Sequence, residues 1–210
     1  MIKKIFLSSM LIMLSVAVFA QTKAKYVFYF IGDGMGVNQV NATETYLASL
    51  KGVIGTEPIC FASFPYSAFV NTQSATNGVT DSAGGTALAT GNKTKNGAIG
   101  TLKDQTTPVK SIAEAARDAG AAVGVSTTVS IDHATPAAFY AHVKDRNMYH
   151  EIGVQLTKSN FDFFAASDFL EPVKDNENLY ELSEKAGYTI ARGLADYKAK
   201  EATSERMILF

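Results

Sequence analysis

Short runs of apolar residues alternate with segments of helical periodicity along most of the chain. The continuous runs predict strands buried on both faces of a sheet, at 26–31, 67–71, 122–127, 161–165, 188–192 and 207–210. Helical periodicity and capping residues predict helices over 38–50, 81–90, 108–119 and 147–158. This alternation is typical of an α/β fold with an open, largely parallel sheet and helices on both faces.

The first twenty residues have a different character. Lys3 and Lys4 precede an apolar run over residues 5–19, and the small residues Val18 and Ala20 stand ahead of Gln21. This is the pattern of a secretory signal peptide over 1–20, so we expect a periplasmic or secreted protein. The alternative is an uncleaved membrane anchor, but the run is short for a membrane span and contains three serines. We therefore expect no stable membrane anchor, and a mature domain over residues 21–210.

Composition narrows the class of protein. Of 210 residues, 47% are hydrophobic and 19% are charged, with a formal net charge of −1, as in a soluble globular domain. Basic residues form no stripe, so nucleic acid is not expected as a partner. The single cysteine, Cys60, rules out an intramolecular disulfide, and its apolar neighbours predict a buried side chain without a catalytic role.

Two polar clusters stand where predicted secondary structure changes. Asp33 lies in a Gly-Asp-Gly turn after the strand at 26–31, and the carboxyl ends of parallel strands are where open α/β sheets bind ligands. Ser82 begins the helix at 81–90, where the partial positive charge of a helix N-terminus favours an alkoxide or a bound phosphate. The structural alternative is that Ser82 or Thr80 only caps the helix.

A third cluster follows the strand at 122–127. His133 and Thr135 bring nitrogen and oxygen donors to its carboxyl end, and Arg146 is suited to a bidentate phosphate contact. Each of these residues also has an ordinary role as a surface or helix side chain. The chain has three histidines, and no pair of them has the spacing of a zinc site.

Together and in this order, the clusters closely resemble the alkaline phosphatase family. The matching stretches are YVFYFIGDGMG at 26–36, VTDSAGGTALATGNKTKNGAIG at 79–100 and STTVSIDHATPAAFYAHVKDR at 126–146. The resemblance implies hydrolysis of phosphate monoesters through a phosphoserine, with two Zn²⁺ and one Mg²⁺ in a complete site, and is compatible with a homodimer. A sulfatase or phosphodiesterase is disfavoured by the Asp-Ser-Ala triplet at 81–83.

The resemblance also implies a role for each candidate residue. Ser82 would be the nucleophile and a zinc ligand, and Asp33 would bridge that zinc and the magnesium. Thr135 would ligate the magnesium. Arg146 would hold two phosphoryl oxygens, and Asp81 would orient Arg146.

His133 would lie near the magnesium, at a position where family members carry Asp or His. The family's other ligands, an acidic magnesium ligand and Asp and His residues of both zinc sites, are absent from these residues, and the strand at 207–210 reaches the terminus without a turn. The sequence thus predicts an apparently truncated, N-terminal part of such an enzyme, inactive with zinc by itself. The alternative is a non-catalytic exported fragment or a phosphate-binding remnant.

Overall fold

A computed structural model describes residues 24–210, and the predicted signal peptide lies outside them. The chain divides into two compact units, Met1–Pro65 and Tyr66–Phe210. Within the described residues, no helix combines the length and the apolar character needed to cross a membrane.

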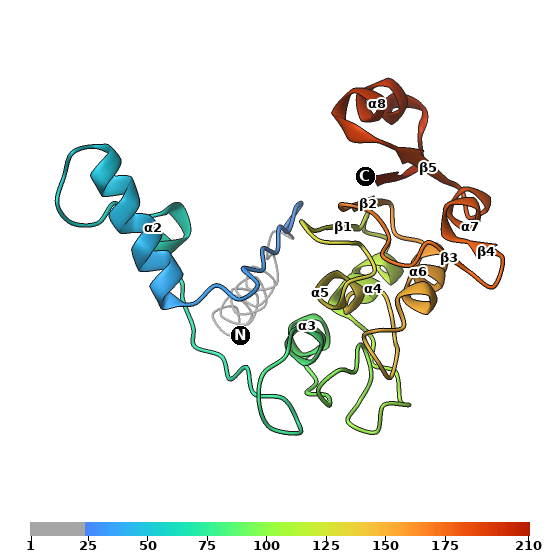
Figure 1. Cartoon of the computed structure of the whole chain (residues 1–210), viewed down its shortest axis with the longest axis horizontal. Coiled ribbons are helices and arrows are strands. Elements are labelled where there is room, and N and C mark those ends of the chain that lie inside the picture. Colours follow the sequence, from blue (N-terminus) through green and yellow to red (C-terminus); the bar gives the residue numbers. More distant parts are fainter. Residues whose placement is uncertain (1–23) are drawn as a thin grey trace, which may run out of the picture. The chain divides into compact units, whose positions relative to one another are not determined.

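The second unit is built on a four-stranded parallel sheet in the order β1-β2-β6-β5 (Figure 1). The strands are β1 (Gly124–Ser126), β2 (Phe163–Ala165), β5 (Tyr188–Ala191) and β6 (Arg206–Leu209). All four fall within or next to predicted runs, and the α/β class with a parallel sheet is confirmed. The last strand of the chain, β6, lies between β2 and β5, so its backbone groups are paired on both sides.

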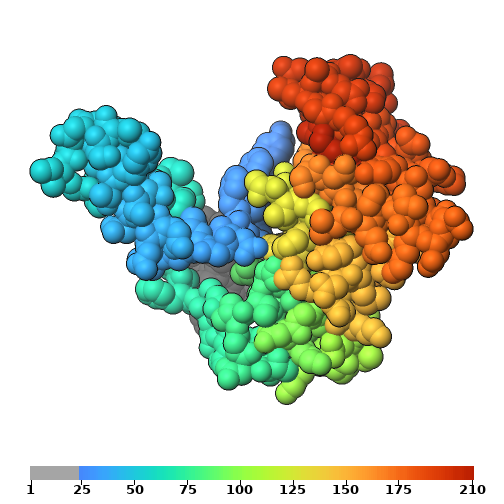
Figure 2. Space-filling view, viewed as in Figure 1, coloured from blue at the N-terminus to red at the C-terminus, as the bar shows by residue number. Residues whose placement is uncertain are grey.

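The core lies on one face of this sheet. Val125, Phe164 and Ile208 are adjacent in register and buried. The Phe164 ring makes an edge contact with Tyr140 at a centroid distance of 5.4 Å. On the opposite face, Phe163 contacts Tyr197 of the helix after β5 at 6.3 Å. Figure 1 shows helices on both sides of this sheet, as predicted. Figure 2 shows the red C-terminal atoms packed on the orange ones before them.

Seven α-helices lie among the described residues. They are α2 (Val37–Leu50), α3 (Asp81–Thr90), α4 (Ile112–Asp118), α5 (Ala134–Ala137), α6 (Tyr149–Lys158), α7 (Leu179–Lys185) and α8 (Gly193–Lys200). The shorter elements are two 3-10 turns, η1 (Cys60–Ser63) and η2 (Glu201–Thr203), and a hairpin of β3 (Val173–Lys174) with β4 (Glu177–Asn178).

The helix predicted at 108–119 begins later than expected. Ser111 caps α4 by accepting a hydrogen bond from Glu114 N at 3.0 Å, and the Glu114 carboxylate accepts one from Ser111 N at 2.7 Å. Pro108 lies outside the helix, in a bridge with Thr101. The capping box at Ser111 therefore determines the start, and the proline does not.

Three predictions from apolar runs are wrong. Residues 26–31 and 67–71 form no strand, and no strand in the described part of the chain pairs with either segment. Phe30 is 88% exposed and Phe69 is fully exposed. Cys60 is exposed as well, because it opens η1, a turn without a buried residue. An apolar run forms a strand only where another strand supplies hydrogen-bond partners.

Candidate active site

The first turn of α3 carries two of the predicted site residues. Thr80 is the N-cap, and its hydroxyl accepts a hydrogen bond from Ala83 N at 3.3 Å. The Asp81 carboxylate accepts one from Ser82 N at 3.0 Å. The helix ends at Gly91, whose φ of 73° is the left-handed conformation that glycine adopts without strain. Both ends of α3 are thus defined by local sequence, and Ser82 lies at its positive end.

The Ser82 hydroxyl is held by two groups from different parts of the chain. Gly97 N donates to Ser82 Oγ at 3.0 Å, and Thr80 Oγ1 lies 3.2 Å from the same oxygen. Ser82 has no solvent-exposed surface. A phosphate ester therefore reaches Oγ only after neighbouring atoms move aside.

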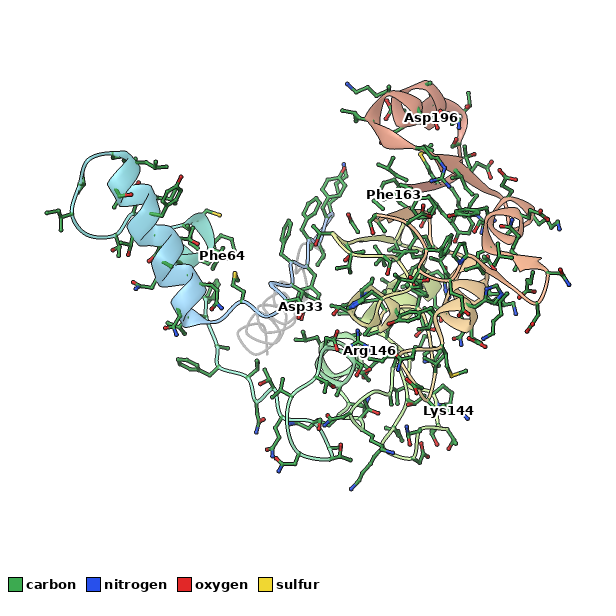
Figure 3. All side chains as sticks on the ribbon, in the orientation of Figure 1. Asp33, Phe64, Lys144, Arg146, Phe163 and Asp196 are labelled. Carbon is green, nitrogen blue, oxygen red and sulfur yellow. The ribbon has the colours of Figure 1, made fainter. Side chains whose placement is uncertain are left out.

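Asp81, Arg146 and His133 form a network beside Ser82. Arg146 Nη1 donates to Asp81 Oδ1, and Arg146 Nη2 lies 3.0 Å from His133 Nε2. Figure 3 shows Arg146 beside the ribbon of α3. An arginine only donates, so His133 Nε2 accepts and the ring proton lies on Nδ1. That buried nitrogen has no hydrogen-bond partner and lies 3.9 Å from Asp81 Oδ2.

The segment 97–100 ties this network together. Gly97, whose N–H reaches Ser82, accepts a hydrogen bond from Arg146 N through its carbonyl at 2.7 Å. Ile99 and Val143 exchange two backbone hydrogen bonds of 2.9 Å. One short segment therefore fixes the nucleophile candidate and the phosphate-binding candidate relative to each other. Residue types predicted no separate role for this segment, because its contacts come from backbone groups that nearly every residue carries.

Gly100 closes the same segment, and a histidine supports it. Gly100 has a φ of 60°, and a Cβ there would overlap the Ala141 carbonyl oxygen. His142 Nδ1 lies 2.7 Å from Gly100 O, and its Nε2 lies 3.1 Å from Glu114 Oε1. The hydrogen bond with Glu114 raises the pKa of His142, although burial opposes the shift. Two acceptors facing the two ring nitrogens favour the imidazolium form.

Thr135 lies on α5, which packs closely on α3. A Cβ added at Gly85 would lie 3.3 Å from Ala138 Cβ and 3.5 Å from Thr135 Cα, so only a small residue in α3 allows this approach. The fully buried Asp132 accepts hydrogen bonds from the backbone after β2, and its burial raises its pKa. The loop that carries His133 is therefore anchored on the residue before it.

Asp33 belongs to the first unit. It lies in a turn closed by a 3.2 Å hydrogen bond from Met35 N to Gly32 O, with Gly34 at a φ of 67°. Ser82 belongs to the second unit, and the structure does not place the two units against each other, so it gives no distance between Asp33 and Ser82. The structure thus brings together four of the predicted residues, Asp81, Ser82, His133 and Arg146, and sets Thr135 on the helix packed beside them.

Metal-ligating side chains form no cluster among the described residues. Within 24–210 no three His, Cys, Asp or Glu side chains gather closely enough to hold an ion. Of the candidates in the second unit, only Ser82 has an implied role as a zinc ligand, whereas a catalytic zinc takes about three protein ligands. The hydroxyl oxygens of Ser82 and Thr135 and the ring nitrogens of His133 are donor types that zinc or magnesium can accept. Their number and arrangement do not by themselves complete a site for either ion.

Comparisons with known proteins agree on one family. The family model described as alkaline phosphatase matches residues 24–168. Alkaline phosphatase 4 of Drosophila melanogaster is 37% identical over 165 residues, which are 74% of this chain and 28% of the relative. The alkaline phosphatase of the Antarctic bacterium TAB5 superimposes with a TM-score of 0.69 at 35% identity, over 81% of this chain and 49% of that structure.

The structural match extends to a cold-active alkaline phosphatase from Shewanella sp. Its TM-score is 0.71 at 28% identity, over 86% of this chain and 44% of that structure. The chain therefore spans less than half the length of each of these relatives. Its parallel sheet and the α3 region correspond to part of a larger fold.

Proposed function

Since this chain belongs to the alkaline phosphatase family, we propose that it carries the nucleophile of a metal-dependent phosphate-monoester hydrolase. The observation that supports this most is the Arg146 guanidinium, which Asp81 holds beside Ser82 at the start of α3. A phosphoryl group next to Ser82 would meet a bidentate donor and a helix N-terminus together.

The proposed reaction has two steps through Ser82. In the first, the bond from Ser82 Oγ to phosphorus forms as the ester P–O bond breaks. The serine proton passes to solvent, and the departing alkoxide takes a proton from solvent. In the second, water hydrolyses the phosphoserine and regenerates the hydroxyl. A covalent intermediate of this kind divides one difficult displacement into two easier ones.

The family's dependence on metals supports the proposed ligand roles. A variant of the TAB5 alkaline phosphatase has Mg bound in a site named M3. For this protein we propose Asp33 and Ser82 as zinc ligands, and Asp33 and Thr135 as magnesium ligands, with His133 close to the magnesium. Bound divalent cations stabilise the charge that develops on attacking and leaving oxygens. The ligands that complete these sites are not among these four residues.

Substrate recognition is proposed to rest on the phosphoryl group. Arg146 and the helix terminus address phosphate oxygens, and nothing in the described network selects a particular alcohol. We therefore propose a broad range of phosphate monoesters as substrates and, from the sequence of residues 1–20, action in the periplasm or outside the cell.

Ester selectivity tests this proposal. The full-length protein, loaded with zinc and magnesium, is assayed with p-nitrophenyl phosphate, bis(p-nitrophenyl) phosphate and p-nitrophenyl sulfate. We expect the monoester to be hydrolysed much faster than the other two, with loss of activity in a chelator and recovery on adding the metals. Preference for the diester or the sulfate would contradict the proposal, as would phosphate binding without turnover.

A further inference from the structure

Thr80 contacts the proposed nucleophile as well as capping its helix. Its Oγ1 lies 3.2 Å from Ser82 Oγ and accepts from Ala83 N at 3.3 Å. The Ser82 oxygen also accepts from Gly97 N at 3.0 Å. The buried hydroxyl of Ser82 is thus held between one backbone donor and one side-chain hydroxyl, with no exposed surface through which water could replace either.

The donors and acceptors leave few arrangements for these hydroxyls. Each hydroxyl has one proton and two lone pairs. Gly97 uses one lone pair of Ser82 Oγ, and Ala83 uses one of Thr80 Oγ1. One proton and one lone pair remain on each oxygen, so the hydrogen bond between Thr80 and Ser82 can run in either direction while Ser82 keeps its proton. Once that proton has left, only Thr80 can donate.

We propose that Thr80 is a positioning residue for phosphoryl transfer: its hydroxyl, together with the Gly97 N–H, holds Ser82 Oγ in one rotamer. Threonine suits this task because its β-branch restricts χ1 and so fixes the direction of the hydroxyl. The kinetic consequence rests on the proposed function. Thr80 itself neither gains nor loses a proton; its hydroxyl donates to Ser82 Oγ once the serine proton has left.

A helix cap alone makes a different prediction. Serine, asparagine and threonine all cap helices. If Thr80 only caps α3, Thr80→Ser and Thr80→Asn should behave alike. If its hydroxyl positions Ser82, Thr80→Ser should retain function, whereas Thr80→Asn and Thr80→Val should lose it.

The experiment compares these three variants in the full-length protein with zinc and magnesium. The control is Thr157→Val in α6, which removes a buried hydroxyl bonded to Val154 O at 2.9 Å, far along the chain from Ser82. The rate of phosphoenzyme formation is measured by rapid acid quench with p-nitrophenyl phosphate. Competitive inhibition by inorganic phosphate reports on Arg146, and the Ser82 χ1 couplings and Gly97 amide exchange are measured by NMR.

We expect Thr80→Val and Thr80→Asn to slow phosphorylation about tenfold or more, as for the loss of one buried hydrogen bond to a reacting atom. Thr80→Ser and the Thr157→Val control should stay within about threefold of the wild type. Phosphate inhibition should change little in all of them, because Arg146 keeps its contact with Asp81. Equal rates in Thr80→Asn and Thr80→Ser, or a wild-type rate in Thr80→Val, would overturn the proposal.

The NMR measurement separates this inference from the proposed function. If the wild type forms no phosphoenzyme, the proposed function fails, but the rotamer still decides the role of Thr80. A single χ1 state of Ser82 in the wild type and Thr80→Ser, with averaging in Thr80→Val and Thr80→Asn, supports positioning. A single unchanged rotamer in all four proteins contradicts it.

Discussion

Two aspartate-bearing turns that each precede a helix look alike in the sequence and differ in the structure. The turn at Asp33 leads into α2, where Gly36 N bonds to the nearby Gln39 side chain, and Ala48 is the only buried residue among residues 24–65. The turn at Asp81 leads into α3, where partners 15 and 65 residues away contact Ser82 and Asp81. The side chains at the start of α3 are thus held by segments distant in the sequence.

Removing an aromatic ring should change the free energy of unfolding far more in the second unit than in the first, and this is the largest difference that we expect. Phe164→Ala removes a fully buried ring from the sheet core, and we expect a loss of about 3–5 kcal/mol in unfolding free energy. Phe30→Ala, on a ring that is 88% exposed, should change it by less than about 0.5 kcal/mol. Urea unfolding of both variants checks this. Equal losses would mean that Phe30 is buried in solution.

Two glycines with positive φ form the next matched pair. At Gly100 a Cβ would overlap a backbone carbonyl, so Gly100→Ala should cost at least roughly 2 kcal/mol. At Gly34 no heavy atom lies within 4 Å of the added Cβ, so the cost should be limited to about 1 kcal/mol of backbone strain. Thermal unfolding measures both. A mild Gly100→Ala variant would show that segment 97–100 is not held as described.

Arg146→Ala tests whether the guanidinium group beside the first turn of α3 binds phosphate. A bidentate contact to phosphate is worth a few kcal/mol at most, so inhibition by phosphate should weaken by about 10- to 100-fold. Turnover should fall without disappearing, because the proposed cations would supply most of the charge stabilisation. Arg146→Lys keeps the charge and should recover only part of the loss. An unchanged inhibition constant in Arg146→Ala would mean that this side chain does not face the phosphate.

The smallest effect that we expect is a pH dependence of stability from the pair of His142 and Glu114. The raised pKa of His142 in the folded state stabilises the protein below its unfolded value, near 6.5, and this contribution is lost as pH rises through the folded pKa. Burial tends to raise the pKa of Glu114, but hydrogen bonds with His142 and Ser111 lower it overall, so its contribution is lost in acid.

The melting-temperature difference between wild type and His142→Gln should therefore be largest in mildly acidic solution and shrink as pH rises. Glu114→Gln should show the same trend, because it removes the other half of the pair. A difference that does not vary with pH would contradict a charged pair.

Local signals explain which elements the sequence predicted well. Thr80 and Gly91 limit α3, and the helix appears with the predicted bounds. The four strands of the parallel sheet lie within or next to predicted apolar runs. None is longer than the run that predicted it, because the length of a strand depends on where the neighbouring strand pairs with it. The helices α7 and α8 were missed: they have only 7 and 8 residues, and α8 buries none of them, so apolar periodicity is weak.

The candidate site was likewise predictable in its residues but not in its long-range contacts. Residue types and order pointed to Ser82 and Arg146, because hydroxyl and guanidinium groups carry recognisable chemistry. The contacts that hold them were not predictable, because Gly97 acts through its N–H and carbonyl, groups common to nearly every residue. The segment at 26–31 shows the reverse error, a strong apolar pattern without a paired strand.

Trapping of the phosphoenzyme tests the central claim most directly. The full-length protein with zinc and magnesium is incubated with labelled phosphate at acidic pH, quenched, digested and mapped. We predict one label per chain on the peptide that contains Ser82, and none in Ser82→Ala, although the Thr80 hydroxyl is only 3.2 Å away. Undiminished labelling of Ser82→Ala, or a label on Thr80 in the wild type, would contradict the assignment of Ser82 as the nucleophile.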